Sequence, residues 1–271
     1  MLSRLAEHRV AKPWGRTDLP EAFGERPDKP IGEIWFEREA GDDDALLVKY
    51  LFTSERLSVQ VHPDDAVARA AGHRSGKDEA WLILAAEPDA KLGIGLREPL
   101  TPDALRTAAL DGSIADMLDW RAARSGDAYY SPAGTLHSIG AGLTLLEVQQ
   151  NCDLTYRLYD FGRPRELHLD SGIAAARPGA RIEMACARPI AEGREIVAQG
   201  PKFTLERWRS AAGKLQANAG EPLWLIPLWG TVTANGQELE PPSVWIAEEP
   251  VRIDSATGEV VVAYEGSAIR P

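Results

Sequence analysis

The sequence of 271 residues has only two cysteines, Cys152 and Cys186, and they share no CxxC-type spacing. We therefore expect neither a disulfide nor a cysteine metal site, and both thiols are predicted to be free in a reducing compartment. No run approaches the roughly 20 apolar residues of a membrane helix, so we expect no membrane partner. Charged side chains also interrupt residues 1–14, which argues against a secretory leader and makes a cytoplasmic location the default expectation.

Basic residues are scarce as well: 30 Lys and Arg stand against 41 Asp and Glu, a formal net charge of −11. No cluster of Lys and Arg stands out, so nucleic acid is not an expected partner. An anionic substrate would need a local cationic pocket set against this overall charge. The length allows two modest domains or one large one.

Histidine is rare too, with five residues in the chain, yet one of them stands in an alternating segment. From Leu57 to His62, apolar residues alternate with Ser58, Gln60 and His62. A strand would point these three polar groups at one face. Polar groups of this kind on one strand face suggest a site inside a β-barrel.

Two further metal-type side chains follow along the chain. Glu79 begins another predicted strand, in which Trp81 and Ile83 share its face, and His137 comes after a Pro-x-Gly turn at residues 132–134. Two imidazoles, a carboxylate and an amide oxygen suit Zn²⁺, and Mn²⁺, Fe²⁺ or Co²⁺ would suit the same ligands. We therefore predict one divalent ion bound by Gln60, His62, Glu79 and His137.

The order of these motifs resembles the cupin fold, with Gln60 where most cupins carry their first histidine. Gln-x-His-Pro-Asp at 60–64, Lys-x-Glu at 77–79 and Pro-x-Gly-Thr-x-His at 132–137 resemble the type I phosphomannose isomerases. Residues 146–160 look like that family's signature after the last metal histidine. Lys-Pro-Trp-Gly at 12–15 matches too, although the family's second glycine is an arginine here. The resemblance is specific from residue 12 to about 163 and weak beyond.

The resemblance implies a zinc-dependent isomerase that interconverts mannose 6-phosphate and fructose 6-phosphate through a cis-enediol. Such a reaction needs an electrophile for the oxygens, a base for the carbon-bound proton and cations for the phosphate. The resemblance implies Arg157 and Glu147 as catalytic, and strand alternation adds Lys77, which shares a face with Glu79. Lys77 and Glu147 compete as the base. Those implied as substrate-binding are Lys49, Ser58, Trp14 and Asp153.

Arg157 is predicted to share a strand face with Asp153 and Thr155. If that face points into the barrel, a guanidinium near a divalent cation needs carboxylates or a substrate anion to offset its charge. We expect Glu147 and Asp153 to provide the carboxylates and the substrate to provide the rest.

Two other readings stay open beside the isomerase. One is a cupin metalloenzyme acting on another sugar, against which Gln60 and the segment Thr155-Tyr156-Arg157 speak. The other is a non-catalytic or regulatory sugar-phosphate-binding cupin, which would be expected to lose ligands or the arginine. The sequence does not decide the metal that is loaded, or between a monomer and a homodimer.

The coarse organisation predicts a mainly β protein of two cupin-type, jelly-roll-like barrels with a short helical insert at about 98–120. We expect a metal-binding domain at 1–177, a connector at 178–200 and a degenerate second cupin domain at 201–271. No histidine follows His168, so the second domain is expected to have no metal site and to serve packing.

Local signals place several elements. Residues 45–52 and 57–62 are predicted to form a β-hairpin, and residues 64–71 a short helix. Thr101, Pro102 and Gly112 are predicted to begin and end a second helix, and Ser113 to cap a third. In the second half, separate strands are expected at 223–229, 231–234, 251–254 and 259–264, with a tight hairpin turn at Asn235-Gly236.

Overall fold

The protein was analysed as a computed structural model, which describes residues 1–24, 26–38, 44–179, 182, 184–185 and 187–271. Across these residues the chain forms three β-sheets and four short α-helices. The prediction of a mainly β protein with a short helical insert is therefore confirmed. Cys152 is a buried free thiol, whereas Cys186 lies outside the described residues. Within the described ranges, no helix is long and apolar enough to cross a membrane.

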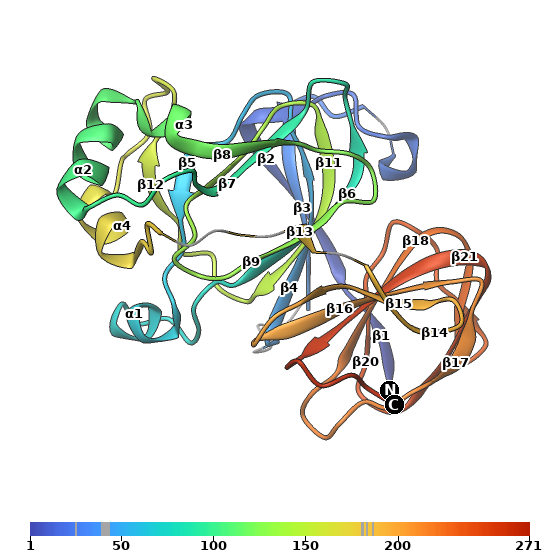
Figure 1. Cartoon of the computed structure of the whole chain (residues 1–271). Coiled ribbons are helices and arrows are strands. Elements are labelled where there is room, and N and C mark those ends of the chain that lie inside the picture. The colour runs from blue at the N-terminus through green and yellow to red at the C-terminus, as the bar shows by residue number, and fades with distance from the viewer. Residues whose placement is uncertain (25, 39–43, 180–181, 183, 186) are drawn as a thin grey trace.

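Two of the sheets face each other and form the first unit of the molecule (Figure 1). The seven-stranded sheet has the order β13 (Met184–Ala185), β9 (Ala128–Ser131), β6 (Glu79–Ala86), β11 (Leu143–Gln150), β4 (Leu46–Phe52), β3 (Ile31–Glu37) and β2 (Ala6–Arg16). The five-stranded sheet has the order β12 (Tyr156–Tyr159), β5 (Val59–Val61), β10 (His137–Ile139), β7 (Lys91–Leu96) and β8 (Leu118–Ala122).

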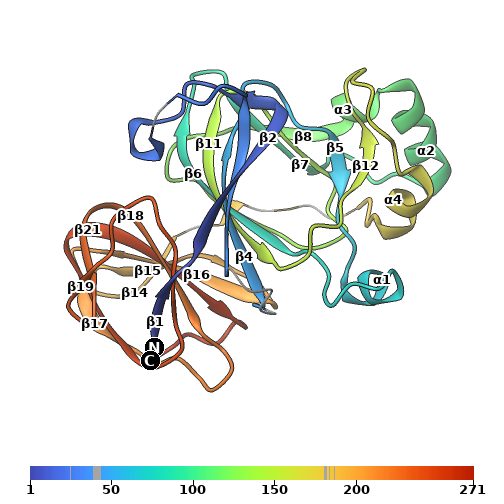
Figure 2. The same ribbon diagram turned by 180° about the vertical axis from the view of Figure 1, so that it is seen from behind.

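The nine-stranded sheet forms the second unit. Its main path is β1 (Leu2–Arg4), β20 (Trp245–Ala247), β18 (Leu223–Ala234), β21 (Val251–Glu265), β16 (Phe203–Arg209), β15 (Arg194–Gln199) and β14 (Arg188–Ala191), and β17 (Ala212–Leu215) and β19 (Gln237–Glu238) pair with β21 and β18. Figure 2 shows β1 reaching from the first unit into this sheet, with both chain ends side by side. The sheet thus takes in strands β14 and β15 from the expected connector and β1 from the expected first domain, and the division into domains stays a prediction.

The seven-stranded sheet is covered on both faces, which explains why every residue of β4 is buried. Val48 and Tyr50 pack toward the nine-stranded sheet in one apolar cluster, whereas Leu51 packs with Trp81 and Ile83 in another between the two sheets of the first unit. Alternation along a strand sends successive side chains to opposite faces. The predicted shared face of Glu79, Trp81 and Ile83 follows from the same alternation.

The predicted hairpin between residues 45–52 and 57–62 is wrong. β4 pairs with β3 and β11, whereas β5 pairs with β10 and β12 in the other sheet. The connection between them is tied to a distant loop, because the Thr53 hydroxyl donates to the Gly140 carbonyl at 2.7 Å and accepts from the Leu143 amide. Alternation identifies a strand but not its partner. The crossing puts Lys49 and Gln60 on opposite walls of the first unit.

The helices are α1 (Asp65–Ala70), α2 (Pro102–Asp111), α3 (Ile114–Met117) and α4 (Leu169–Ala175), with a 3-10 turn at Glu21–Phe23. Thr101 caps α2 by accepting from the Ala104 amide, and Gly112 ends it in the left-handed conformation at φ 84°. Both signals worked as predicted. The predicted cap by Ser113 is wrong, since its side chain makes no capping bond and its amide instead donates to Asp111.

The expected breaks near residues 230 and 256 are also wrong, because β18 and β21 each run through them as one long strand. Gly230 pairs directly with Gly258, and a Cβ at Gly230 would lie 2.2 Å from the Thr257 carbonyl oxygen. These glycines therefore permit a close backbone approach rather than a turn. The turn predicted at Asn235-Gly236 is confirmed, with φ of 51° and 81° between β18 and β19.

Candidate metal centre and its cavity

Strand register gathers polar residues on the inner face of the five-stranded sheet. Gln60 on β5 lies directly opposite His137 on β10 and opposite Arg157 on β12. His62 follows β5 by one residue. On the facing sheet, Glu147 of β11 lies opposite Lys49 of β4. The site is therefore assembled between two sheets from segments far apart in the chain.

The four predicted metal ligands lie together. His62 Nε2 is 3.2 Å from Glu79 Oε1, and His137 Nε2 is 3.6 Å from Glu79 Oε2. Gln60 Nε2 is 3.2 Å from His137 Nε2. Bonds of about 2.1 Å to a tetrahedral ion place donor atoms about 3.4 Å apart. Among the described residues, His62, Glu79 and His137 form one buried group with ligand atoms within 4.8 Å of one another.

Hydrogen bonds hold both imidazoles in the tautomer that a metal requires. The Nδ1–H groups donate to main-chain carbonyls, His62 to Leu154 at 3.1 Å and His137 to Thr135 at 3.0 Å. Each Nε2 lone pair then faces the site. Burial lowers the pKa of both rings, that of His137 to about 4, so both are neutral near pH 7. Neutral imidazole is the ligand form.

Glu79 shows the strongest need for a cation. Its Oε2 is buried and has no hydrogen-bond partner among the described residues. Burial acts to raise the pKa of Glu79, but His62 and Lys77 outweigh it and hold the pKa well below the usual range. A buried carboxylate with an orphaned oxygen beside two imidazole lone pairs fits a bound divalent ion.

Two neighbours adjust this donor set. The Ser58 hydroxyl donates to Gln60 Oε1 at 3.0 Å, and a half-turn of the Gln60 amide would exchange its oxygen and nitrogen. The Lys77 ammonium contacts Glu79 Oε1 and lies 3.3 Å from His62 Nε2. Burial acts to lower the pKa of Lys77, but Glu79 and Glu147 outweigh it and raise that pKa. The Lys77 ammonium therefore lies beside two of the atoms predicted to bind the ion, Glu79 Oε1 and His62 Nε2.

The second buried carboxylate, Glu147, lies against a different set of partners. Its Oε2 accepts from Trp81 Nε1 at 2.8 Å, and its Oε1 is 3.8 Å from Lys49 Nζ. Burial, reinforced by the charge of Glu79, raises the pKa of Glu147 to about 7. Such a carboxyl exchanges a proton near neutral pH, which suits general acid–base chemistry.

The expected pairing of Arg157 with Glu147 and Asp153 is wrong. Both carboxylates pair instead with Lys49, at 3.8 and 3.4 Å, because register sets β4 beside β11. Arg157 Nη1 donates to the Glu166 carbonyl at 2.8 Å, and its Nε is buried without a partner among the described residues. Burial and the nearby Arg165 lower the pKa of Arg157. The guanidinium of Arg157 therefore still has an N–H group that can donate to a bound anion.

These groups open into a cavity of about 260 Å³. The predicted site residues that line it are Trp14, Lys49, Ser58, Gln60, Lys77, Glu79, Glu147, Asp153 and Arg157, whereas His62 and His137 are not part of its lining. Three charged lining residues were missed: Lys12, its ion-pair partner Glu33 at 3.3 Å, and Arg165. Lys12 stands in the quoted Lys-Pro-Trp-Gly motif and was identifiable. Glu33 reaches the cavity through the register of β3, and Arg165 through the loop between β12 and α4.

No protein-family model matches the chain. It is 36% identical over 183 residues to the mannose-6-phosphate isomerase of Streptococcus mutans, which covers 64% of this chain and 58% of that protein. It is 38% identical over 156 residues to the mannose-6-phosphate isomerase ManA of Bacillus subtilis, which covers 53% and 49%. In sequence, the chain thus spans about half the length of the curated relatives it matches.

The likeness to solved structures covers nearly the whole chain. The crystal structure of the Bacillus subtilis mannose 6-phosphate isomerase superposes with a TM-score of 0.83 at 25% identity, over 96% of this chain and 98% of that one. A zinc-bound mannose 6-phosphate isomerase superposes with a TM-score of 0.74 at 15% identity, over 98% and 99%, which shows the fold. The cupin-type fold class and the resemblance to phosphomannose isomerases are confirmed.

Proposed function

We propose that the protein is a metal-dependent aldose–ketose isomerase that interconverts mannose 6-phosphate and fructose 6-phosphate through a cis-enediol. The observation that carries this is the buried group His62, Glu79 and His137, which adjoins a polar cavity lined by Glu147 and Arg157. The likeness to mannose-6-phosphate isomerases supports the choice of substrate. Its cytoplasmic location and oligomeric state stay predictions.

The proposed metal ligands are His62, Glu79, His137 and Gln60, and the ligand types favour zinc. When bound, the ion would supply Lewis acidity to the carbonyl and hydroxyl oxygens of the sugar. The main-chain bonds of the two imidazoles fix the ligand tautomer. The Gln60 oxygen accepts from Ser58, so the amide would make a half-turn to offer that oxygen to the ion. The two imidazoles are thus preorganised by this chain's own hydrogen bonds.

Glu147 is our proposed general base. Trp81 Nε1 holds one of its oxygens, the other faces Lys49, and the carboxylate lines the cavity. A base removes the proton from one carbon of the sugar and, as its conjugate acid, returns it to the adjacent carbon. Lys77, also in the cavity lining, is the competing candidate for the base. As an ammonium it would instead donate a proton to a sugar oxygen.

We propose that Arg157 stabilises negative charge on the substrate. Its guanidinium lines the cavity, and its Nε has no partner among the described residues, so it can steady the charge that develops as the proton leaves carbon. Lys49 and Ser58 are proposed phosphate contacts, Trp14 a wall of the sugar pocket and Asp153 a polar contact. All four line the same cavity.

The second unit is proposed to carry no catalytic chemistry. Among the described residues of 201–271, no group of His, Cys, Asp or Glu meets the ligand geometry found at His62. The apolar cluster shared by the seven-stranded and nine-stranded sheets supports a packing role.

A coupled assay tests the proposal. Purified protein should convert mannose 6-phosphate to fructose 6-phosphate, lose turnover after chelation and regain it with added zinc. A panel of other aldose phosphates separates the rivals. Saturable binding without turnover would identify a non-catalytic sugar-phosphate-binding protein. Metal-dependent turnover of another sugar alone would identify a different cupin metalloenzyme.

A further inference from the structure

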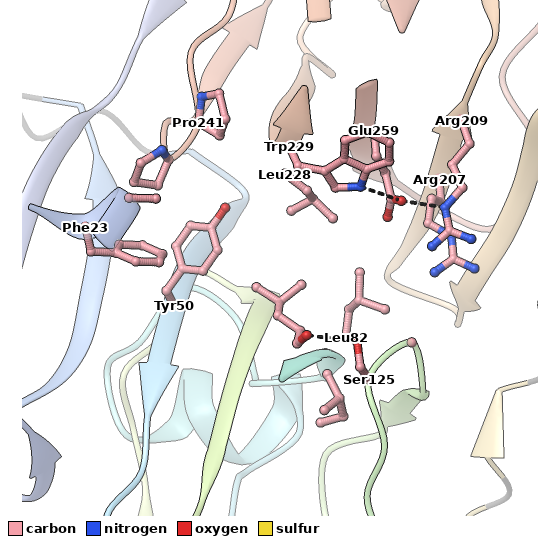
Figure 3. Close-up of a pocket in the computed structure, with 15 residues that line it drawn as sticks. Phe23, Tyr50, Leu82, Ser125, Arg207, Arg209, Leu228, Trp229, Pro241 and Glu259 are labelled. Carbon is pink, nitrogen blue, oxygen red and sulfur yellow. Dashed lines mark hydrogen bonds and ion pairs between the residues drawn. The ribbon is translucent and has the colours of Figure 1, made fainter. Parts of the chain in front are cut away.

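A second cavity, of about 270 Å³, lies on the other side of the seven-stranded sheet from the metal centre. One wall comes from that sheet, with Tyr50 of β4 and Leu82 of β6, and the other from the nine-stranded sheet, with Trp229 of β18 and Glu259 of β21 (Figure 3). The proposed isomerase chemistry uses no residue of this outer cavity.

Tyr50 is the feature that points to a ligand. The residue is only 2% exposed, and its ring packs edge-on against Phe23 with centroids 5.0 Å apart. Figure 3 shows the hydroxyl directed into the cavity. This hydroxyl is not among the fully buried polar atoms without a partner in the described part of the chain, so a solvent molecule in the cavity can reach it. A hydroxyl that faces a cavity can exchange its bond to water for a bond to a bound molecule, so this group is placed to contact a ligand.

The opposite wall is rigid and polar. Glu259 is 4% exposed, and its Oε2 accepts from Trp229 Nε1 at 3.1 Å and from Arg209 Nε. The indole is therefore held in one orientation while 56% of Trp229 stays exposed. An aromatic ring held beside a carboxylate and a guanidinium is ordered before a ligand arrives, as in sites that bind small molecules.

The charges favour a neutral ligand. Arg209 is paired with Glu259, and Arg207 Nε donates to Glu195 at 2.7 Å. Both cations among the described residues that line the cavity are therefore already neutralised, so neither is free for a phosphate dianion. The volume lies just below the roughly 300–1,000 Å³ of drug-sized sites, so a single ring fits.

We propose that the outer cavity binds a neutral monosaccharide. One face of the ring would pack on Trp229, and ring hydroxyls would bond to Tyr50 and to the Arg209–Glu259 pair. Hydroxyls both donate and accept, which matches a phenol, a carboxylate and guanidinium N–H groups. This site is separate from the proposed substrate site, because Tyr50 and Lys49 leave β4 on opposite faces.

Indole N–H signals in a ¹H–¹⁵N spectrum of the intact protein test the proposal at the site itself. The Trp229 signal is assigned as the one absent from Trp229→Phe. Probes are D-mannose, D-glucose and D-fructose, with glycerol as an acyclic polyol control and mannose 6-phosphate as the charged comparison. We expect the Trp229 signal to shift saturably at millimolar concentrations of at least one neutral sugar, and more weakly with the phosphate and with glycerol.

Matched tyrosine variants supply the second readout. Tyr50→Phe removes only the hydroxyl and should raise the midpoint of the Trp229 shift about three- to tenfold. Tyr129→Phe makes the same change in a residue outside the cavity lining and should leave the midpoint unchanged. Three results would overturn the proposal: a Trp229 signal that no neutral sugar moves, one that only mannose 6-phosphate moves, or an unchanged midpoint in Tyr50→Phe.

Discussion

Lys49 and Tyr50 are consecutive on β4 yet open into two different cavities. Lys49 Nζ lies 3.8 Å from Glu147 Oε1 in the inner cavity, whereas the Tyr50 side chain lines the cavity between the two units. Both faces of this strand are covered, so its successive side chains point alternately into two different buried regions. Substitutions at these neighbouring positions should therefore affect different ligands.

The metal site is tested by its histidines. His62→Ala and His137→Ala each remove one nitrogen donor, and we expect elemental analysis to show zinc falling from about one ion per chain to well below that. His73→Ala, at an exposed turn after α1, should keep its metal. Full metal retention in both site variants would remove these residues from the ligand set.

Arg157 is expected to act on the reaction and not on the metal. Arg157→Ala should lower kcat about 10²–10³-fold, the usual loss for one electrostatic stabiliser, with metal content and melting temperature near those of the unaltered protein. Arg157→Lys should recover part of the rate because it keeps the charge but not the fork of donors. Arg106→Ala, on α2 and outside the cavity lining, is the control. Near-normal turnover in Arg157→Ala would leave it a structural role only.

Glu147→Gln keeps the size of the side chain and removes its basicity. We expect kcat to fall about 10²–10⁴-fold with the metal retained. A base works deprotonated, so kcat/KM of the unaltered protein should fall as the pH drops below about 7, the pKa of Glu147. Glu87→Gln, at the surface, should change neither rate nor profile. Near-normal kcat in Glu147→Gln would exclude Glu147 as the base.

Asp65 is expected to join the two units. Its carboxylate accepts from Lys202 Nζ of the second unit at 2.7 Å, from the Gly76 amide at 2.8 Å and from Gln150 at 3.1 Å. Burial acts to raise the pKa of Asp65, but these donors outweigh it and lower the pKa to about 2. We expect Asp65→Asn to reduce the free energy of unfolding at pH 7 by about 1 kcal/mol, after allowance for solvent screening.

The pH dependence gives this prediction its sign. A depressed folded-state pKa stabilises the protein above the unfolded value of 3.8, and the gain is lost as the pH falls toward about 2. Denaturant unfolding should therefore show the difference between Asp65→Asn and the unaltered protein shrinking over that range. Asp28→Asn, at an exposed site, should show no such trend. A constant difference at all pH values would exclude ionisation as its cause.

The proposed packing role of the second unit is tested at Glu206. This residue is fully buried, and its carboxylate accepts from Arg194 Nε at 2.6 Å and from the Tyr264 hydroxyl at 3.2 Å. Glu206→Gln leaves the Arg194 charge without its partner, and we expect about 3 kcal/mol of destabilisation. Below the melting transition, kcat and metal content should stay unchanged. A large loss of kcat in the folded variant would contradict the packing role.

Local sequence determined much of the metal centre and several element boundaries. The alternation around Gln60 and the shared face of Glu79 and Trp81 are properties of single strands, so they could be predicted from neighbouring residues. The left-handed residue Gly112 and the turn at Asn235 depend on backbone preferences of a few residues and were predicted for the same reason.

Tertiary structure alone decided which strands meet. The pairing of β4 with β11 rather than β5 gave Lys49 the carboxylates that were expected for Arg157. The facing of Gly230 and Gly258 turned an apparent break into a continuous ladder. The outer cavity at Tyr50 exists only because two sheets pack face to face. Such contacts join residues far apart in the chain, and their free energies depend on shape and burial that no local pattern carries.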